Sequence, residues 1–241
     1  MKQLNTDFGT VRIGSQEKIF SRLVDIMETA AASFGDPFTI GLTGGSTPLA
    51  FYKWAREEEA LSKAVLLHAI WSVSDERFVP LSSPESNFGN ADREFLVPFD
   101  VPAERKCPWP IQVDPHSAAL VFERRMRERY GTERAFDLCL LGMGDDGHTA
   151  SIFPNSPLLH IQAAQFFAPV DVPDKGWRLS ITPEGLKSCG KIVVMVTGSG
   201  KAHRIQKVFN GPENTYPIQL LKACAKRVEW LMDEEAAKEL K

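Results

Sequence analysis

The sequence predicts an α/β fold, doubly wound around a mostly parallel sheet. Short apolar segments alternate with amphipathic helical segments along most of the chain, which is typical of strands joined by helical crossovers. Such strands pair in parallel through right-handed connections, and their near-continuous apolar character indicates a sheet covered on both faces. The chain has 241 residues, 43% hydrophobic and 24% charged, so we expect a single domain over residues 1–241.

Apolar periodicity places the individual elements. Helices are expected where apolar residues recur every three or four positions: 15–34 with Ser15 as its cap, a helix starting at Thr47-Pro48, 115–130 and 203–209. Short apolar runs predict strands at 37–43, 68–77, 136–144 and 191–197. The tail at 229–240 predicts a last strand and a terminal helix, and the proline-rich piece at 99–110 predicts a surface loop.

The charge and cysteine content exclude several classes of function. With a formal net charge of -3, the chain has no field that would hold nucleic acid or an anionic membrane, so we expect neither as a partner. No apolar run approaches the roughly 20 residues that a bilayer demands, and the N-terminus does not read as a signal peptide. The cysteines form no CxxC pair, which indicates reduced thiols in a cytoplasmic protein.

Polar motifs follow four of the expected strands. They read GGST (44–47), SDER (74–77), GDDGH (144–148) and GSGK (198–201). Ligands of open α/β sheets bind outside the carboxyl ends of the strands, so we expect these motifs to meet in one crevice. Their residue types suit an anionic ligand the size of a sugar.

Two of these motifs resemble nucleotide-binding sequences without fitting them. Gly142, Gly144 and Gly147 match G-x-G-x-x-G, but Asp145 and Asp146 place carboxylates where a pyrophosphate would approach. GSGK lacks the first glycine and the hydroxyl residue of a P-loop. We therefore expect no nucleotide.

The turn Gly44-Gly45-Ser46-Thr47 is a better candidate for binding phosphate. Glycines let backbone N–H groups turn toward one anion at a helix N-terminus, and the two hydroxyls add donors. Lys201, at a neighbouring strand end, supplies a positive charge. The alternatives are an ordinary capped turn and a solvated lysine.

His148 is the candidate catalytic base. It follows a strand end and a glycine turn, and Asp146 precedes it as an orienting or electrostatic partner. Asp75 and Arg77, at another strand end, are further candidate catalytic groups. Arg77 can bind an oxyanion through two N–H groups, and a surface ion pair is the alternative.

Metal and covalent catalysis lack their sequence signatures. The HxxxH and HExxH spacings are absent, so we expect no metal site. No G-x-S-x-G motif marks a serine nucleophile. Attack by water is the mechanism that remains.

The chain resembles the glucosamine-6-phosphate isomerase/6-phosphogluconolactonase family. The resemblance lies in TGGSTP (43–48), SDERFVPLSSPESNFGNA (74–91), FDLCLLGMGDDGHTASIFP (136–154), VTGSGKA (196–202) and EWLMDEEAA (229–237). It implies a modified Rossmann-like sheet. It also implies hydrolysis of 6-phospho-D-glucono-1,5-lactone to 6-phospho-D-gluconate in the oxidative pentose phosphate pathway, without a cofactor.

The resemblance further implies roles for individual residues. His148 corresponds to the proposed catalytic histidine and Arg77 to the substrate-binding arginine. Residues 44–47 correspond to the ligand-binding turn, and Lys201 to the basic residue after the late strand. Arg178, in WRLSIT, resembles the arginine of a strand that contributes to phosphate binding.

Two other functions remain open on the same residues. A sugar-phosphate deaminase or isomerase would use a carboxylate such as Asp75 to move a C2 proton, although GDDGHTASIFP and the DER triplet favour the lactonase. A sensor would bind the phosphorylated sugar without catalysis. For the lactonase we expect a small phosphorylated sugar lactone as the partner, and a monomer or weak homo-oligomer.

Overall fold

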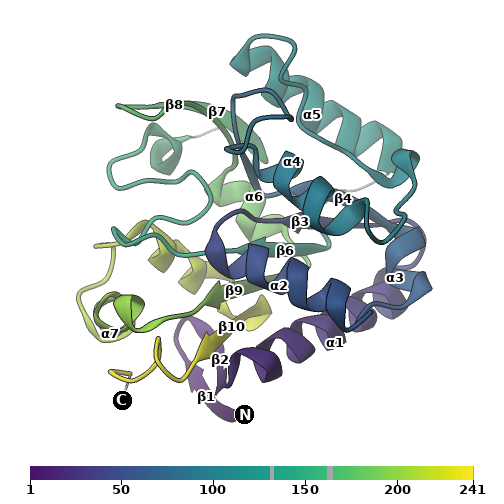
Figure 1. Cartoon of the computed structure of the whole chain (residues 1–241). Helices are drawn as coiled ribbons and strands as arrows, with labels where there is room; N and C mark the ends of the chain where they lie inside the picture. The colour runs from purple at the N-terminus through teal and green to yellow at the C-terminus, as the bar shows by residue number, and fades with distance from the viewer. Residues whose placement is uncertain (131–132, 162–164, 241) are drawn as a thin grey trace.

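The computed structural model describes residues 1–130, 133–161 and 165–240, and a seven-stranded sheet runs through its centre (Figure 1). The strand order is β1-β2-β10-β9-β6-β3-β4, and every pairing except β1–β2 is parallel. The strands are β1 (Lys2–Thr6), β2 (Gly9–Gly14), β3 (Phe38–Leu42), β4 (Ala69–Val73), β6 (Leu138–Leu141), β9 (Lys191–Val196) and β10 (Val228–Asp233). The predicted doubly wound, mostly parallel α/β fold is confirmed.

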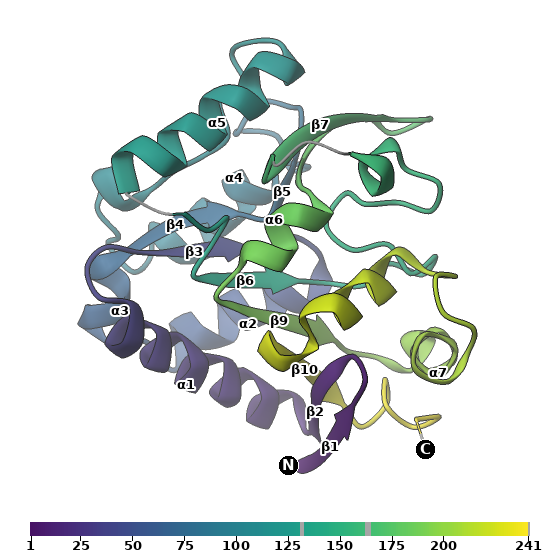
Figure 2. The same cartoon turned by 180° about the vertical axis from the view of Figure 1, so that it is seen from behind.

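Helical segments cover both faces of this sheet. Helix α2 lies in front of the sheet in Figure 1, whereas α6 and the 3-10 helix η5 lie in front in the opposite view of Figure 2. Helix α1 packs against α2, and α6 against η5. The α-helices are α1 (Gln16–Phe34), α2 (Ser46–Glu57), α3 (Lys63–His68), α4 (Asn87–Ala91), α5 (Pro115–Tyr130), α6 (Pro183–Ser188) and α7 (Ala202–Asn210). The other helical segments are η1 (Asp92–Leu96), η2 (Ala103–Arg105), η3 (Pro157–His160), η4 (Ser199–Lys201) and η5 (Pro217–Arg227).

Helix α1 shows how closely local signals fix an element. The Ser15 side chain accepts a hydrogen bond from the N–H of Lys18 and caps the first turn. Apolar residues at helical spacing, among them Ile19 and Leu23, are buried against the sheet. The helix ends at Gly35, whose φ of 81° is the left-handed conformation that glycine adopts at low cost. The predicted helix at 15–34 is therefore confirmed.

A smaller antiparallel sheet stands beside the large one. It has the order β5-β8-β7 and consists of β5 (Asp75–Arg77), β7 (Phe167–Val172) and β8 (Gly176–Ile181). Ser74 joins the two sheets: its N–H donates to the Leu42 carbonyl at 2.7 Å, and its own carbonyl accepts from Ile181 at 2.9 Å. This junction places the small sheet next to the carboxyl end of β3.

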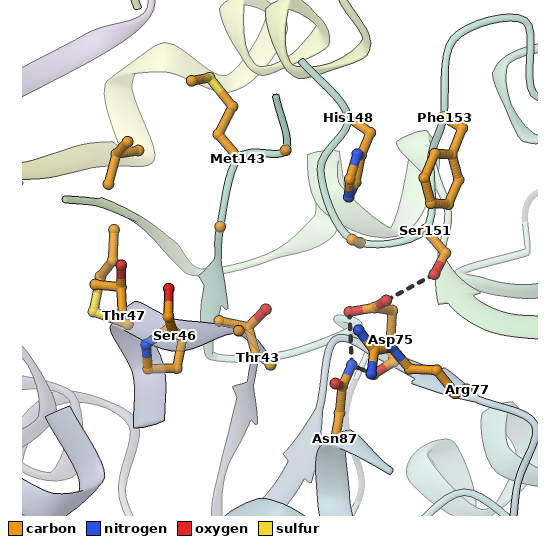
Figure 3. A pocket seen from close by; sticks show the side chains of 18 of the residues that line it. Thr43, Ser46, Thr47, Asp75, Arg77, Asn87, Met143, His148, Ser151 and Phe153 are labelled. Atoms are coloured by element: carbon orange, nitrogen blue, oxygen red, sulfur yellow. Dashed lines mark hydrogen bonds between the residues drawn. The ribbon is translucent and has the colours of Figure 1, made fainter. Parts of the chain in front are cut away.

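The carboxyl ends of β3, β6 and β9 lie side by side at one edge of the large sheet. After β4 the chain crosses back over β3, so that the next strand of this sheet, β6, pairs with the other side of β3. Open α/β sheets bind their ligands at such a reversal, because the loops leaving the two strands diverge there. The loops at this edge line the pocket drawn in Figure 3.

Two expected elements are wrong in part. Residues 68–77 are not one strand: β4 ends at Val73, and Asp75–Arg77 pairs with β8 in the small sheet. The tail beyond Asp233 forms turns instead of a terminal helix. The Asp233 carboxylate accounts for this, since it accepts the N–H groups of Gly198, in the loop after β9, and of Ala236.

The proline-rich piece 99–110 is less exposed than a surface loop. Trp109 is buried, and its ring stacks on Phe122 of α5 with 4.0 Å between ring centroids. Its indole N–H donates to the Val73 carbonyl at 3.0 Å. The segment therefore covers the end of β4. Across the residues that the structure describes, no helix combines the length and apolar character needed to cross a membrane.

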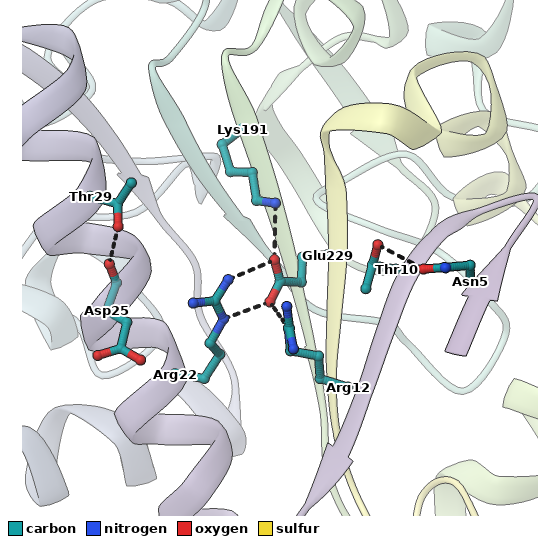
Figure 4. A network of polar contacts seen from close by, with 8 residues as sticks. All are labelled: Asn5, Thr10, Arg12, Arg22, Asp25, Thr29, Lys191 and Glu229. Atoms are coloured by element: carbon teal, nitrogen blue, oxygen red, sulfur yellow. Dashed lines mark hydrogen bonds and ion pairs between the residues drawn. The ribbon is translucent and has the colours of Figure 1, made fainter. Parts of the chain in front are cut away.

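The opposite edge of the large sheet carries an ion network around Glu229 (Figure 4). The Glu229 carboxylate, only 4% exposed, receives Arg12 at 2.6 Å, Arg22 at 2.8 Å and Lys191 at 3.0 Å. These cations come from β2, α1 and β9, so one side chain of β10 joins three elements. Burial alone would raise the pKa of Glu229, but the hydrogen bonds from Arg22 and Lys191 hold it at about 2.

Replacing Glu229 by glutamine tests the contribution of this network to stability. We expect Glu229→Gln to lower the free energy of unfolding at pH 7 by about 2 kcal/mol, because three partly exposed cations would then face a neutral amide. A carboxylate with a lowered pKa stabilises the fold above its unfolded-state pKa, and this contribution is lost as the pH falls toward about 2. The difference in free energy of unfolding between wild type and variant, measured with urea, should therefore become smaller as the pH falls from about 5 to about 2. An exposed control, Glu184→Gln, should change little, and a pH-independent gap would contradict this account.

Candidate active site

One pocket of about 430 Å³ collects residues from all four strand-end motifs. Figure 3 shows His148 and Phe153 on one wall, facing Asp75 and Arg77 on the other, with Ser46 farther along. Of the candidate site residues, those that line the pocket are Gly44, Gly45, Ser46, Thr47, Asp75, Arg77, His148, Arg178 and Lys201. Asp146 does not line the pocket itself.

Asp146 holds His148 from behind the pocket wall. One oxygen of its carboxylate lies 2.6 Å from Nδ1 of the imidazole and 3.0 Å from the main-chain nitrogen of His148. Partial burial acts to raise the pKa of Asp146, but the hydrogen bonds from His148 outweigh it and the pKa lies below its ordinary value. Asp146 is therefore an ionised partner that fixes the orientation of the ring.

The His148 ring is also held by close packing. A Cβ at Gly144 would approach Nδ1 and Cε1 of the ring to 2.1 Å, so only glycine leaves room for the imidazole there. Phe153 stacks on the ring, with 4.3 Å between centroids and an interplanar angle of 30°. With Nδ1 held by Asp146, Nε2 is the ring nitrogen left to act on a ligand.

Asp75 is buried at the far wall of the pocket. Its carboxylate accepts the Ser151 hydroxyl at 2.7 Å, and the Asn87 side-chain amide donates to its main-chain carbonyl at 2.8 Å. Burial raises the pKa of Asp75, and the hydrogen bond from Ser151 and the charge of Arg77 oppose this only in part. A buried carboxyl with a raised pKa is suited to proton transfer.

The neighbouring Glu76 does not form the surface ion pair considered as an alternative for this motif. Its side chain is buried, and its carboxylate accepts the main-chain N–H groups of Arg77, Asn87 and Phe88. Ser86 adds a hydroxyl donor at 2.9 Å. Glu76 thus fixes the start of α4, and with it Asn87, against the pocket.

Arg77 and Arg178 stand directly opposite each other across β5 and β8. The side-chain hydrogen bonds of both go to main-chain carbonyls, of Glu85 and Trp177, and both arginines line the pocket. Burial and the nearby charge of Arg77 lower the pKa of Arg178. Like charges opposite each other across a strand pair repel, and an anion placed between them removes that cost.

The glycine turn presents the N-terminus of α2 to the same pocket. Gly45 has a φ of 110°, and the Asn87 side chain packs so closely on Gly44 that a Cβ there would lie 1.9 Å from Oδ1. No side chain caps α2 at Gly45, so the first N–H groups of the helix remain available to an anion. The Thr47 hydroxyl is 2.6 Å from that of Thr197.

Lys201 reaches the pocket from the end of β9. Its Nζ donates to the Met143 carbonyl at 3.0 Å and pairs with the Asp145 carboxylate at 2.5 Å. Lys201 is thus held by the GDDGH turn and is not a freely solvated lysine. Within the described ranges, no three His, Cys, Asp or Glu side chains are grouped so that they could hold a metal ion.

Sequence reasoning did not single out several residues of this pocket, among them Asn87, Ser151, Phe153 and Lys175. Lys175 lies in the turn between β7 and β8, and its ammonium is 4.5 Å from the centre of the Phe153 ring. Asn87, Ser151 and Phe153 fall inside two of the segments that carry the family resemblance, which was the available signal. Lys175 lies outside every motif singled out in the sequence, and its place in the pocket follows from the pairing of β7 and β8.

The fold is Rossmann-like, and several cationic side chains line its pocket. A family model described as glucosamine-6-phosphate isomerases/6-phosphogluconolactonase matches residues 15–230, so the chain belongs to this family. A 6-phosphogluconolactonase of Synechocystis sp. is 33% identical over 215 residues, which cover 84% of this chain and 85% of the relative.

Two solved structures show the same fold. A 6-phosphogluconolactonase from Trypanosoma cruzi superposes with a TM-score of 0.83 at 24% identity, covering 100% of both chains. A monomeric glucosamine-6-phosphate deaminase superposes with a TM-score of 0.77 at 19% identity, covering 95% of this chain and 99% of that one. The fold alone therefore does not separate the lactonase from the deaminase.

Inorganic phosphate should stabilise the protein by binding in this pocket. At about ten times its dissociation constant, phosphate should raise Tm by about 3–6 °C, because a ligand of the folded state shifts the unfolding equilibrium. Arg178→Met should reduce the shift, since it removes one of the two facing arginines. Chloride at the same ionic strength is the control in differential scanning calorimetry. An equal shift with chloride, or an undiminished shift in the variant, would refute the anion site.

Proposed function

We propose that this protein is a 6-phosphogluconolactonase, which hydrolyses 6-phospho-D-glucono-1,5-lactone to 6-phospho-D-gluconate in the oxidative pentose phosphate pathway. Membership of the family and the 6-phosphogluconolactonase relatives support this assignment. The observation that carries it is one pocket whose lining combines His148, hydrogen-bonded to Asp146, with several cationic side chains and the uncapped N-terminus of α2.

His148 is the proposed general base. Because ionised Asp146 accepts a hydrogen bond at Nδ1, the proton of the neutral ring resides on Nδ1, and Nε2 offers its lone pair to water. Nε2 takes a proton from that water as its oxygen forms a bond to C1 of the lactone. The C1–O5 bond then breaks, and the imidazolium returns the proton to the departing ring oxygen. One histidine thus carries both proton transfers.

The cations of the pocket divide two tasks between them. The carbonyl oxygen of the lactone becomes an oxyanion in the tetrahedral intermediate, and Arg77, across the pocket from His148, is proposed to stabilise it. The phosphate is proposed to bind at the N-terminus of α2, at residues Gly44–Thr47, with Lys201 and Arg178. Binding energy from the phosphate then fixes C1 against the attacking water.

A deaminase or isomerase acting on a sugar phosphate is the second candidate. Asp75 favours it, because a buried carboxyl with a raised pKa lies in the pocket where it could move a C2 proton. Release of ammonia from glucosamine-6-phosphate, with no acceleration of lactone hydrolysis, would establish this candidate in place of the lactonase. Binding of 6-phosphogluconate without either activity would indicate a sensor.

We further propose that residues 1–241 act as one domain, in the cytoplasm, as a monomer or weak homo-oligomer. The net charge of -3 supports the absence of nucleic acid and membrane partners. The substrate is then the only partner that the catalytic cycle requires.

His148→Ala should lower kcat on freshly generated lactone by about 10²–10⁴-fold, the usual contribution of a general base. The measurement couples product formation to 6-phosphogluconate oxidation, with the spontaneous rate subtracted. His203→Ala, which removes an exposed histidine of α7, is the matched control and should keep wild-type turnover. Full turnover in His148→Ala would remove this residue from the mechanism.

Lys201→Ala should mainly raise KM, by about 10-fold or more, because the hydrogen bonds of a charged group to phosphate contribute about 1.5–3 kcal/mol. Its kcat should change much less, since Lys201 is placed at the remote end of the substrate. The same coupled assay measures both constants. If KM stays at the wild-type value, Lys201 does not bind the phosphate.

A further inference from the structure

The ammonium of Lys201 is already paired with a carboxylate from the chain itself. Asp145 Oδ1 lies 2.5 Å from Nζ of Lys201, and this hydrogen bond and charge hold the pKa of Asp145 below its ordinary value. Lys201 lines the pocket, whereas the Asp145 side chain is 90% exposed. The partner that neutralises Lys201 is therefore free to leave it.

From this contact we infer that Asp145 is an affinity-determining residue that competes with the phosphate of the substrate for Lys201. The inference rests on the proposed function, in which Lys201 binds phosphate. The carboxylate of Asp145 occupies Lys201 in the free protein and must either swing away or remain beside an incoming dianion. Either course weakens substrate binding.

The main chain of Asp145 is fixed, so the competition comes from its side chain. Arg204 of α7 donates from Nε to the Asp145 carbonyl at 2.5 Å, and its guanidinium lies over the Tyr216 ring at 4.6 Å. Tyr216 in turn packs against Gly147 of the same turn, whose carbonyl accepts the N–H of Ile218 at 3.1 Å. The turn thus keeps the carboxylate within reach of Lys201 while rotation of one side chain releases it.

Asp145 and Asp146 are adjacent but bind different residues of the pocket lining. Asp146 binds the imidazole of His148, and Asp145 binds Lys201. The hydrogen bond and charge of Lys201 act most strongly on Asp145, and the charge of His148 acts on it less. Removal of the Asp145 charge should therefore act mainly on phosphate binding and change the proton transfers little. This separates an effect on KM from an effect on kcat.

The test is Asp145→Asn, which keeps the size of the side chain and removes its charge. We expect two constants to fall by about 2- to 10-fold: KM for the lactone and the inhibition constant of inorganic phosphate. Two like charges a few ångströms apart near the surface repel each other, and removing this repulsion should strengthen binding by about this factor. Wild-type kcat should be retained. Glu235→Gln is the matched control, since Glu235 is also exposed and paired with a lysine, Lys238 at 3.7 Å, outside the pocket. It should leave both constants unchanged.

A double-mutant cycle with Lys201→Ala distinguishes the outcomes. If the inference holds, Asp145→Asn lowers KM in the wild-type background and has a much smaller effect once Lys201 is absent. If Lys201→Ala raises KM but Asp145→Asn leaves it unchanged or raises it, Asp145 merely positions the lysine, and the inference fails while the proposed function stands. If Lys201→Ala leaves KM unchanged, the phosphate role of Lys201 fails as well. Should Asp145→Asn misfold, Asp145→Ser serves for the same comparison.

Discussion

The site depends on the parallel alignment of β3, β6 and β9, whose carboxyl ends meet at one edge of the sheet. Parallel strands send every following loop to the same edge, so motifs more than 50 residues apart in the sequence become neighbours. The glycine turn, the histidine and Lys201 each leave one of these strands. Interactions between sequence neighbours could not bring these three groups together. The proposed chemistry therefore depends on the parallel alignment of the strands.

Charge is distributed very differently at the two edges of the sheet. At the amino edge, the buried Glu229 carboxylate gathers three cations and ties α1 and three strands together. Next to the carboxyl edge, in the small sheet, Arg77 and Arg178 face each other with hydrogen bonds to main-chain carbonyls. The first arrangement satisfies its charges within the fold. The second keeps positive charge available, which is what binding an anion requires and what stability alone would not favour.

Much of the fold could be predicted from the sequence because its signals are local. Ser15, the apolar periodicity of α1 and the apolar runs of β3, β6 and β9 each act within a few residues. The strand-end motifs also indicated the pocket, because a single topological rule connects them.

The small sheet was not predicted, since β5 has three residues and its pairing depends on Ser74 joining two sheets. The turns of the tail were not predicted either, because the Asp233 carboxylate accepts the N–H of Gly198 in a distant loop as well as that of Ala236. Asn87 enters the pocket only because Gly44 leaves room for it, a contact between distant segments that no spacing in the sequence encodes.

The central claim is that the imidazole of His148 and a phosphate-binding site at the N-terminus of α2 face each other across one pocket, separated by about the length of a sugar. A crystal structure of the protein with 6-phosphogluconate, the proposed product, tests this most directly. The account predicts the phosphate at the N-terminus of α2 beside Lys201, with the C1 carboxylate next to Nε2 of His148. A product bound in the reverse direction, or bound outside this pocket, would contradict it.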